Sequence, residues 1–212
     1  GMEDPAECWK LIIKPDDIVG LKTNVWPNLP TPPELVQVFR RGVMGAGVAA
    51  ENIDEGDRDV LRREVFQKAT ALINSRPLRT HSWSGVGSLI KNYITFVREP
   101  WKWHDDSCAD LGGLWNLPVC KGKTRLNVLV ALTPQFYGIG PHHFDPSHVW
   151  RYGGLLVGTD PVALDALGVK LLAEQRARFF ERPPRGGTST KHVVLAETRH
   201  GAGVADLDRI EI

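Results

Sequence analysis

The feature that most constrains the fold is a short segment, residues 126–132 (LNVLVAL), which is apolar at almost every position. A strand with one face in water alternates apolar and polar side chains, whereas a strand covered on both faces is apolar throughout. Strands of the second kind lie in the middle of parallel sheets, where helices pack on both sides. The segment therefore predicts an interior strand of an α/β protein.

The rest of the chain alternates between strand and helix patterns. Short β-branched runs predict strands, and amphipathic runs bounded by capping residues and glycines predict helices. This alternation indicates a layered α/β fold with a largely parallel or mixed sheet and helices on both faces. The predicted strands are residues 18–25, 69–74, 126–132, 155–158 and 207–212, and the predicted helices are residues 31–41, 57–68, 84–93, 161–178 and 191–200.

Two predicted helices begin with strong capping signals. In the first, Thr31 is the expected N-cap, Pro32 is the first helical residue, and Glu34 completes a capping box. Gly42 is expected to end this helix. In the second, Asp160 is the expected N-cap before Pro161.

Length and composition indicate one domain over residues 1–212, with a long Trp-rich loop at about residues 98–118. A net charge of +1, from interleaved acidic and basic residues, gives no electrostatic case for a nucleic-acid partner. No apolar run approaches the length of a membrane span. The expected location is therefore the cytoplasm, or outside it if a leader has been removed.

The three cysteines, Cys8, Cys108 and Cys120, are widely spaced, and no Cys-x-x-Cys motif occurs. Neither an iron–sulfur cluster nor a zinc ribbon is therefore expected, and reduced thiols are the expected state.

Polar residues follow the predicted strands and point to a ligand site. If the strands are parallel, these residues share the carboxyl edge of the sheet, where α/β proteins bind ligands. Basic side chains there, together with helix N-termini, suit a phosphate or carboxylate group on a small ligand. The alternative is that the basic residues are solvated or pair with Asp160 and Asp165. The predicted ligand-binding residues are Lys22, Asn24, Arg79, Lys91, Asn92, Thr159 and Asp160.

His81 is the predicted general acid or base if the protein is an enzyme, because it lies inside the most specific motif of the sequence, RTHSWSGVGSLIKN at 79–92. Asp160 and Asp165 are not expected to form a catalytic acid/base pair of carboxylates, since they are five residues apart along a helix and Asp160 has a capping role. Cys108 is a weaker candidate nucleophile near His104.

A second group of candidate residues would suit a transition metal. His142, His143, Asp145 and His148 fall within one loop, and imidazole and carboxylate ligands suit zinc, nickel or iron. Adjacent histidines point in opposite directions on an extended backbone, and no familiar metal-binding spacing occurs. Hydrogen-bonded or surface histidines are the alternative.

Four segments, in order, carry a family resemblance: LKTN at 21–24, LRTH…GVGSLIKN at 78–92, GIGP at 138–141 and GTDPVALD at 158–165. With the ending HGAGVADLDRIEI, they resemble the domain of unknown function 362 family over most of the chain, from about residue 18. The resemblance implies a bacterial or archaeal α/β domain without an established activity. Some members carry ferredoxin-type clusters or a twin-arginine export signal, and neither is seen in this sequence.

The sequence departs from this family in two places. Members commonly have an acidic residue late in the strand where this chain has Val130, which weakens any metal site implied by the resemblance. A strand is also expected after residue 52, where this chain has DEGDRD (54–59).

Two other classes of function stay open. One is a non-catalytic redox or assembly accessory, which would show an exposed apolar patch near residues 101–115 for a protein partner. The other is a metal-dependent enzyme that uses the His-rich loop.

Overall fold

A six-stranded sheet runs through the computed structural model, which describes residues 4–138, 143–182 and 189–211. The strand order is β2-β1-β3-β5-β6, and β4 pairs with the far end of β3. Neighbours among β1, β2, β3 and β5 are parallel, whereas β6 is antiparallel to β5 and β4 to β3. The predicted mixed, largely parallel sheet is confirmed. The strands are β1 (Val19–Lys22), β2 (Ile53–Gly56), β3 (Ala71–His81), β4 (Gly85–Gly87), β5 (Thr124–Gln135) and β6 (Gly154–Gly158).

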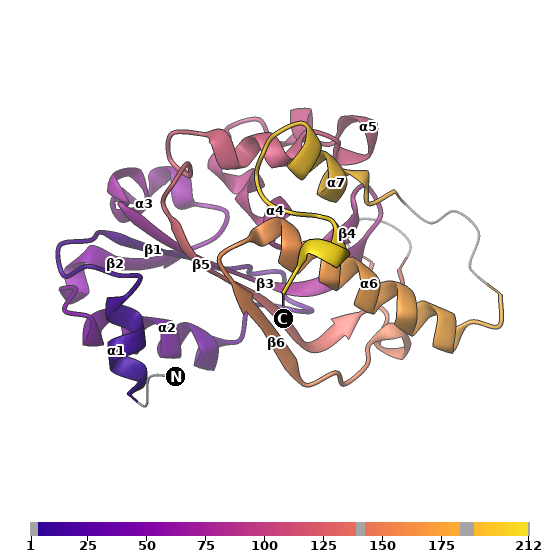
Figure 1. Cartoon of the computed structure of the whole chain (residues 1–212), viewed down its shortest axis with the longest axis horizontal. Helices are drawn as coiled ribbons and strands as arrows, with labels where there is room; N and C mark the ends of the chain where they lie inside the picture. The colour runs from indigo at the N-terminus through magenta and orange to yellow at the C-terminus, as the bar shows by residue number, and fades with distance from the viewer. Residues whose placement is uncertain (1–3, 139–142, 183–188, 212) are drawn as a thin grey trace.

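Helices pack on both faces of this sheet (Figure 1). On one face lie α1 (Pro5–Lys10) and α2 (Pro33–Gly45). The other face carries α3 (Glu64–Lys68), α4 (Leu89–Asn92), α6 (Pro161–Phe179) and α7 (Lys191–Thr198), with α5 (Asp105–Cys108) beside α7. Short 3-10 helices occur at Ala50–Asn52, Val60–Arg62, Tyr93–Phe96, Pro100–Trp103, Leu111–Asn116, Pro146–His148 and Leu207–Arg209.

Strand β5 explains the apolar segment that predicted the fold. Val128 and Val130 pack into the core on the α2 side, while Leu129 and Ala131 pack into the core on the α6 side. All four are buried, because helices cover both faces of β5. Val130, the position where the family resemblance implies an acidic residue, is therefore a core residue here.

The predicted helix at 84–93 is wrong in its first half. Gly85 has a φ of 70°, and the turn there brings β4 back onto the end of β3. The Ser84 hydroxyl donates to the Val86 carbonyl at 2.7 Å and does not cap a helix. The helix that follows, α4, begins only at Leu89.

The predicted start of α2 is also wrong. The Thr31 hydroxyl accepts a hydrogen bond from the Asn24 amide and donates to the Ser75 carbonyl, so it ties the chain to the sheet. The helix runs past Gly42 to Gly45. A Cβ at Gly42 would lie 2.1 Å from Cε2 of Trp9, so close packing of α1 requires the glycine.

The segment after residue 52 contains the strand that the family resemblance implies. β2 covers Ile53–Gly56, where the DEGDRD sequence suggested none. The helix predicted at 57–68 is broken into a 3-10 turn and α3, because Asp57 turns inward to pair with Lys22. Parallel pairing with β1 outweighs the low strand propensity of the acidic residues.

Two further expectations are corrected at the level of local structure. Residues 98–118 were expected to form a loop, but they contain three short helical segments. Trp115 stacks on Tyr93 at 4.3 Å and Trp103 packs against the core, whereas Trp101 is 62% exposed. The edge strand expected at 207–212 is a 3-10 helix at Leu207–Arg209 instead. None of the helices in the described ranges has the length and apolar character needed to cross a bilayer.

Candidate functional site

A cleft of about 790 Å³ lies where β1 and β2 end and β3 continues to His81. Six of the described residues that line it are basic and two are acidic. This imbalance makes the cleft electropositive. The basic residues are Arg58, Arg62, Arg76, Arg79, Lys91 and Arg98, and the acidic residues are Asp57 and Asp59.

A buried ion pair forms one wall of the cleft. Lys22, at the end of β1, donates from Nζ to Oδ1 of Asp57 at 2.6 Å. Burial lowers the pKa of Lys22 to about 8, although Asp57 opposes this shift. Burial raises the pKa of Asp57, but the Lys22 ammonium and the Val25 amide outweigh it and hold the pKa below its usual range. Both groups are charged at neutral pH, so Asp57 does not cancel the charge of the other cations.

A row of amide side chains continues from this pair across the sheet. Lys22 Nζ also donates to Asn92 at 3.3 Å, Asn92 donates to Asn74 at 2.8 Å, and Asn74 donates to Asn127 at 3.0 Å. Asn127 in turn donates to the Thr159 carbonyl at 3.1 Å. These bonds fix Asn92, the last residue of α4, against the sheet.

Arg76 is the basic residue whose surroundings are most unusual. Its side chain is buried, with 5% relative exposure, and it lines the cleft. Within the described part of the chain, its Nε has no hydrogen-bond partner and no ion pair includes it. Burial lowers its pKa, while the more distant carboxylates of Asp57 and Asp165 raise it.

Arg79 lies further along β3 and stacks on an aromatic ring. Its Cζ is 4.1 Å from the ring centroid of Trp26, and its Nη1 donates to the Thr80 carbonyl at 3.2 Å. Burial and the neighbouring Arg76 lower its pKa to about 9, so it keeps its charge at neutral pH.

His81 ends β3 and is almost fully buried. Its Nδ1 faces the Trp83 amide at 3.3 Å and accepts its hydrogen bond, so the ring proton of the neutral form is on Nε2. Burial lowers the pKa of His81 far below its usual range, and Lys91 and Arg79 lower it further. The predicted role as general acid or base stays a prediction, and this shift favours a neutral donor.

Lys91, on α4, also lines the cleft. Its Nζ lies 3.0 Å from Nε2 of His104 and 3.9 Å from Sγ of Cys108. Burial lowers the pKa of Lys91 to about 8. Burial lowers the pKa of His104 to about 4, with a smaller contribution from the nearby charge of Lys91, so this ring is neutral.

Asp165, a possible partner for the basic residues, has another role. Its two oxygens accept hydrogen bonds of 2.9 Å from the Leu89 and Ile90 amides, at the start of α4. Burial raises its pKa to about 6. Asp165 therefore holds in place the helix that carries Lys91 and Asn92.

Thr159 and Asp160 do not line the cleft. Their predicted place required β6 to be parallel, but it is antiparallel to β5, with Gly158 opposite Asn127. Asp160 accepts from the Val162 and Ala163 amides as the N-cap of α6, as predicted, and also from the Val204 amide. The structure thus brings together Asn24, Arg79, His81, Lys91 and Asn92 in the cleft lining, with Lys22 directly behind.

The predicted metal ligands do not form a cluster in the described ranges. His142 lies outside these ranges, and no group of three His, Cys, Asp or Glu side chains suited to a metal occurs within them. His148 lies 3.2 Å from Asp145 and packs among Phe136, Tyr137, Phe179 and Phe180. His143 contributes its carbonyl to a hydrogen bond from Gln135.

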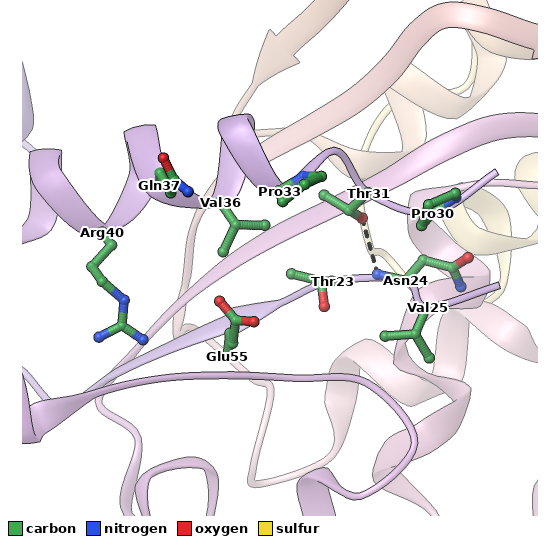
Figure 2. Close-up of a pocket in the computed structure, with 10 residues that line it drawn as sticks. All are labelled: Thr23, Asn24, Val25, Pro30, Thr31, Pro33, Val36, Gln37, Arg40 and Glu55. Atoms are coloured by element: carbon green, nitrogen blue, oxygen red, sulfur yellow. Dashed lines mark hydrogen bonds between the residues drawn. The ribbon is translucent and has the colours of Figure 1, made fainter. Parts of the chain in front are cut away.

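A smaller pocket of about 340 Å³ adjoins the cleft at Asn24, between α2 and the strands β1 and β2 (Figure 2). Figure 2 shows Arg40 and Glu55 at one end and Thr31, which accepts from the Asn24 amide, at the other. It holds one basic and one acidic side chain, so it lacks the charge imbalance of the main cleft.

Sequence reasoning missed Arg76 and Asp57 as cleft residues. Arg76 is three residues before Arg79, but the strand was expected to end at Asn74. The signal was available, because a basic residue inside an otherwise buried strand calls for an anionic partner. The local pattern predicts that Asp57 lies on a surface helix, and nothing in that pattern indicates its pairing with Lys22.

Fold and cleft together define an α/β protein with an electropositive site at the carboxyl ends of parallel strands. The family model described as Domain of unknown function (DUF362) matches residues 47–170, and the chain belongs to this family. No curated protein and no solved structure matches the chain.

Proposed function

We propose that the cleft binds a small ligand through a phosphate or carboxylate group, with Arg76 as the central anchor. The observation that carries this proposal is the buried Arg76 guanidinium, which has neither a hydrogen bond at Nε nor an ion pair among the described residues. A buried charge without a close counterion is unfavourable. An anion in the cleft removes this cost and receives charge-assisted hydrogen bonds.

The neighbours of Arg76 suit the same ligand. Arg79 and Lys91 add positive charge to the cleft lining, and neutral His81 adds an Nε2–H donor. The pairing of Asp57 with Lys22 reduces its repulsion of the anion. The arginines Arg58, Arg62 and Arg98 extend the basic lining and attract anions from solution.

Binding of inorganic phosphate, pyrophosphate and citrate, at constant ionic strength against sodium chloride, tests this proposal. A ligand of the folded state raises the unfolding midpoint as its concentration rises. One charge-assisted hydrogen bond contributes about 1.5–3 kcal/mol, so Arg76→Met is expected to weaken binding by roughly tenfold or more.

Without ligand, the Arg76→Met protein is expected to be at least as stable as the original, because it no longer buries an uncompensated charge. Arg41→Met, which changes an exposed arginine outside the cleft lining, is the matched control and should bind like the original. Stabilisation no greater than that by chloride, or equal binding by Arg76→Met, would overturn the proposal.

A further inference from the structure

The site contains two buried lysines, and their surroundings differ. Nζ of Lys22 has three acceptors: Asp57 at 2.6 Å, the Thr23 carbonyl at 2.7 Å and Asn92 at 3.3 Å. Nζ of Lys91 has no carboxylate within 4.0 Å among the residues described, and its recorded neighbours are His104 and Cys108. The first lysine is part of the framework, whereas the second keeps its amine available to the cleft that it lines.

The surroundings of Lys91 give it a larger fraction of neutral amine than an ordinary lysine has, although the charged form still predominates at neutral pH. Its side chain is 3% exposed, and Arg76 and Arg79 lower its pKa in addition to burial. A lysine that is desolvated beside other cations has a larger fraction of unprotonated amine near neutral pH. The unprotonated amine is the form that attacks carbonyl carbon.

We propose that Lys91 is a nucleophile that forms an imine with a small anionic aldehyde or ketone bound in the cleft. This inference rests on the proposed function, since Arg76 and Arg79 hold the anionic group of the compound near the amine. The ligand class then narrows from any small anion to one that carries both a carbonyl group and a phosphate or carboxylate.

The bond changes balance without an oxidant or reductant. The nitrogen lone pair of the Lys91 amine attacks the carbonyl carbon, and the π electrons of the C=O bond move to oxygen, which takes a proton from nitrogen. The carbinolamine then loses its hydroxyl group and the remaining N–H proton as water, and the C=N bond forms. One amine and one carbonyl give one imine and one water.

His104 is placed to assist the proton movements. Its Nε2 is 3.0 Å from Nζ of Lys91. With Nε2 towards the amine and the proton on Nδ1, the Nε2 lone pair accepts a hydrogen bond from Lys91. This contact orients the amine before attack and carries a proton between nitrogen and oxygen.

Trapping with borohydride tests the inference on the intact protein. Pyridoxal 5′-phosphate, an aldehyde with a phosphate group, is added in equimolar amount, the imine is reduced, and the modified lysine is identified by peptide mass spectrometry. The expected product is a single main adduct at Lys91, which excess inorganic phosphate prevents. Pyridoxal without the phosphate should modify Lys91 at least tenfold more slowly.

Variants separate the contributions of the residues. Lys91→Arg, which keeps the charge, should abolish the adduct while phosphate still stabilises the protein. Arg76→Met should reduce both the yield of the Lys91 adduct and the stabilisation of the protein by phosphate. Lys102→Met is the matched control, because Lys102 is exposed and paired with Glu99, and labelling of Lys91 should not change. Since the adduct is mapped on the original chain, a folding defect in one variant does not affect the main result.

Failure of this inference can be told apart from failure of the proposed function. If phosphate stabilises the protein but Lys91 is not labelled, the inference is wrong and anion binding stands. If Lys91 reacts as fast with pyridoxal as with pyridoxal 5′-phosphate, and inorganic phosphate does not slow the reaction, its reactivity is not linked to an anion site. The inference is then also wrong. If phosphate has no effect and no adduct forms, both proposals are wrong.

Discussion

Nζ of Lys22 lies 2.6 Å from Oδ1 of Asp57, with side-chain exposures of 0% and 5%. Lys10 and Glu7 in α1 form an ion pair at the same 2.6 Å, but these side chains are 50% and 47% exposed. The chain therefore contains two ion pairs with equal lengths and opposite surroundings. Comparing them isolates the effect of burial on stability.

Lys22→Met is expected to lower the free energy of unfolding by about 3–5 kcal/mol, because it leaves the Asp57 carboxylate buried without its cation. Lys10→Met should leave the stability nearly unchanged, since water screens the surface pair. Urea denaturation of both variants measures the difference. Similar stabilities for the two variants would mean that water reaches Asp57.

The two aspartates of α6 are expected to have separable effects. Asp165→Ala leaves the Leu89 and Ile90 amides without acceptors and loosens α4, so both stability and phosphate affinity should fall. Asp160→Ala removes a helix cap outside the cleft lining, with an expected loss of about 1–2 kcal/mol and unchanged phosphate affinity. Calorimetric titration with phosphate measures the affinity of both variants. A loss of affinity in Asp160→Ala would show that Asp160 contributes to phosphate binding.

The pH dependence of stability should reveal Lys91. The pKa of Lys91 is about 8 in the folded protein, and its ordinary value of 10.5 applies to the unfolded chain. Between about pH 8 and pH 10.5 the unfolded chain therefore binds more protons than the folded protein. Stability relative to Lys91→Met should therefore rise from about pH 8 to about pH 10.5, by on the order of 3 kcal/mol.

The groups near Lys91 are Arg76, Arg79 and His81 on β3, His104 at the start of α5, Cys108 at its end, and His192 on α7. Of these, the Cys108 thiol also titrates in alkaline solution, so the comparison is repeated in a Cys108→Ala background to isolate the amine. A stability difference that does not change with pH would contradict a lowered pKa for Lys91.

The stacking of Trp26 on Arg79 is expected to orient the guanidinium for its ligand. A cation–π contact contributes about 0.5–2 kcal/mol. Trp26→Leu should therefore weaken phosphate binding by roughly two- to thirtyfold. Trp101→Leu changes a tryptophan that is 62% exposed and should bind phosphate like the original. Equal affinities in the two variants would show that Arg79 is held without the ring.

The candidate site was only partly predictable from the sequence. Arg79, His81, Lys91 and Asn92 were recognised because they are close in sequence, and all four line the cleft. Arg76 was missed because Ser75, Arg76 and Pro77 interrupt the apolar pattern, and proline is unusual inside a strand. The strand nevertheless continues, since β5 pairs with it as far as Arg79 and β4 pairs with its last three residues.

The sequence by itself determined the α/β class, the central position of β5 and the capped start of α6, because these depend on side-chain periodicity and local hydrogen bonds. Only the tertiary structure decided that β6 is antiparallel, which leaves Thr159 and Asp160 outside the cleft lining. It also decided that Asp57 pairs with Lys22 and that Arg76 does not. Strand direction and charge pairing depend on contacts between residues far apart in the chain, and local patterns do not specify such contacts.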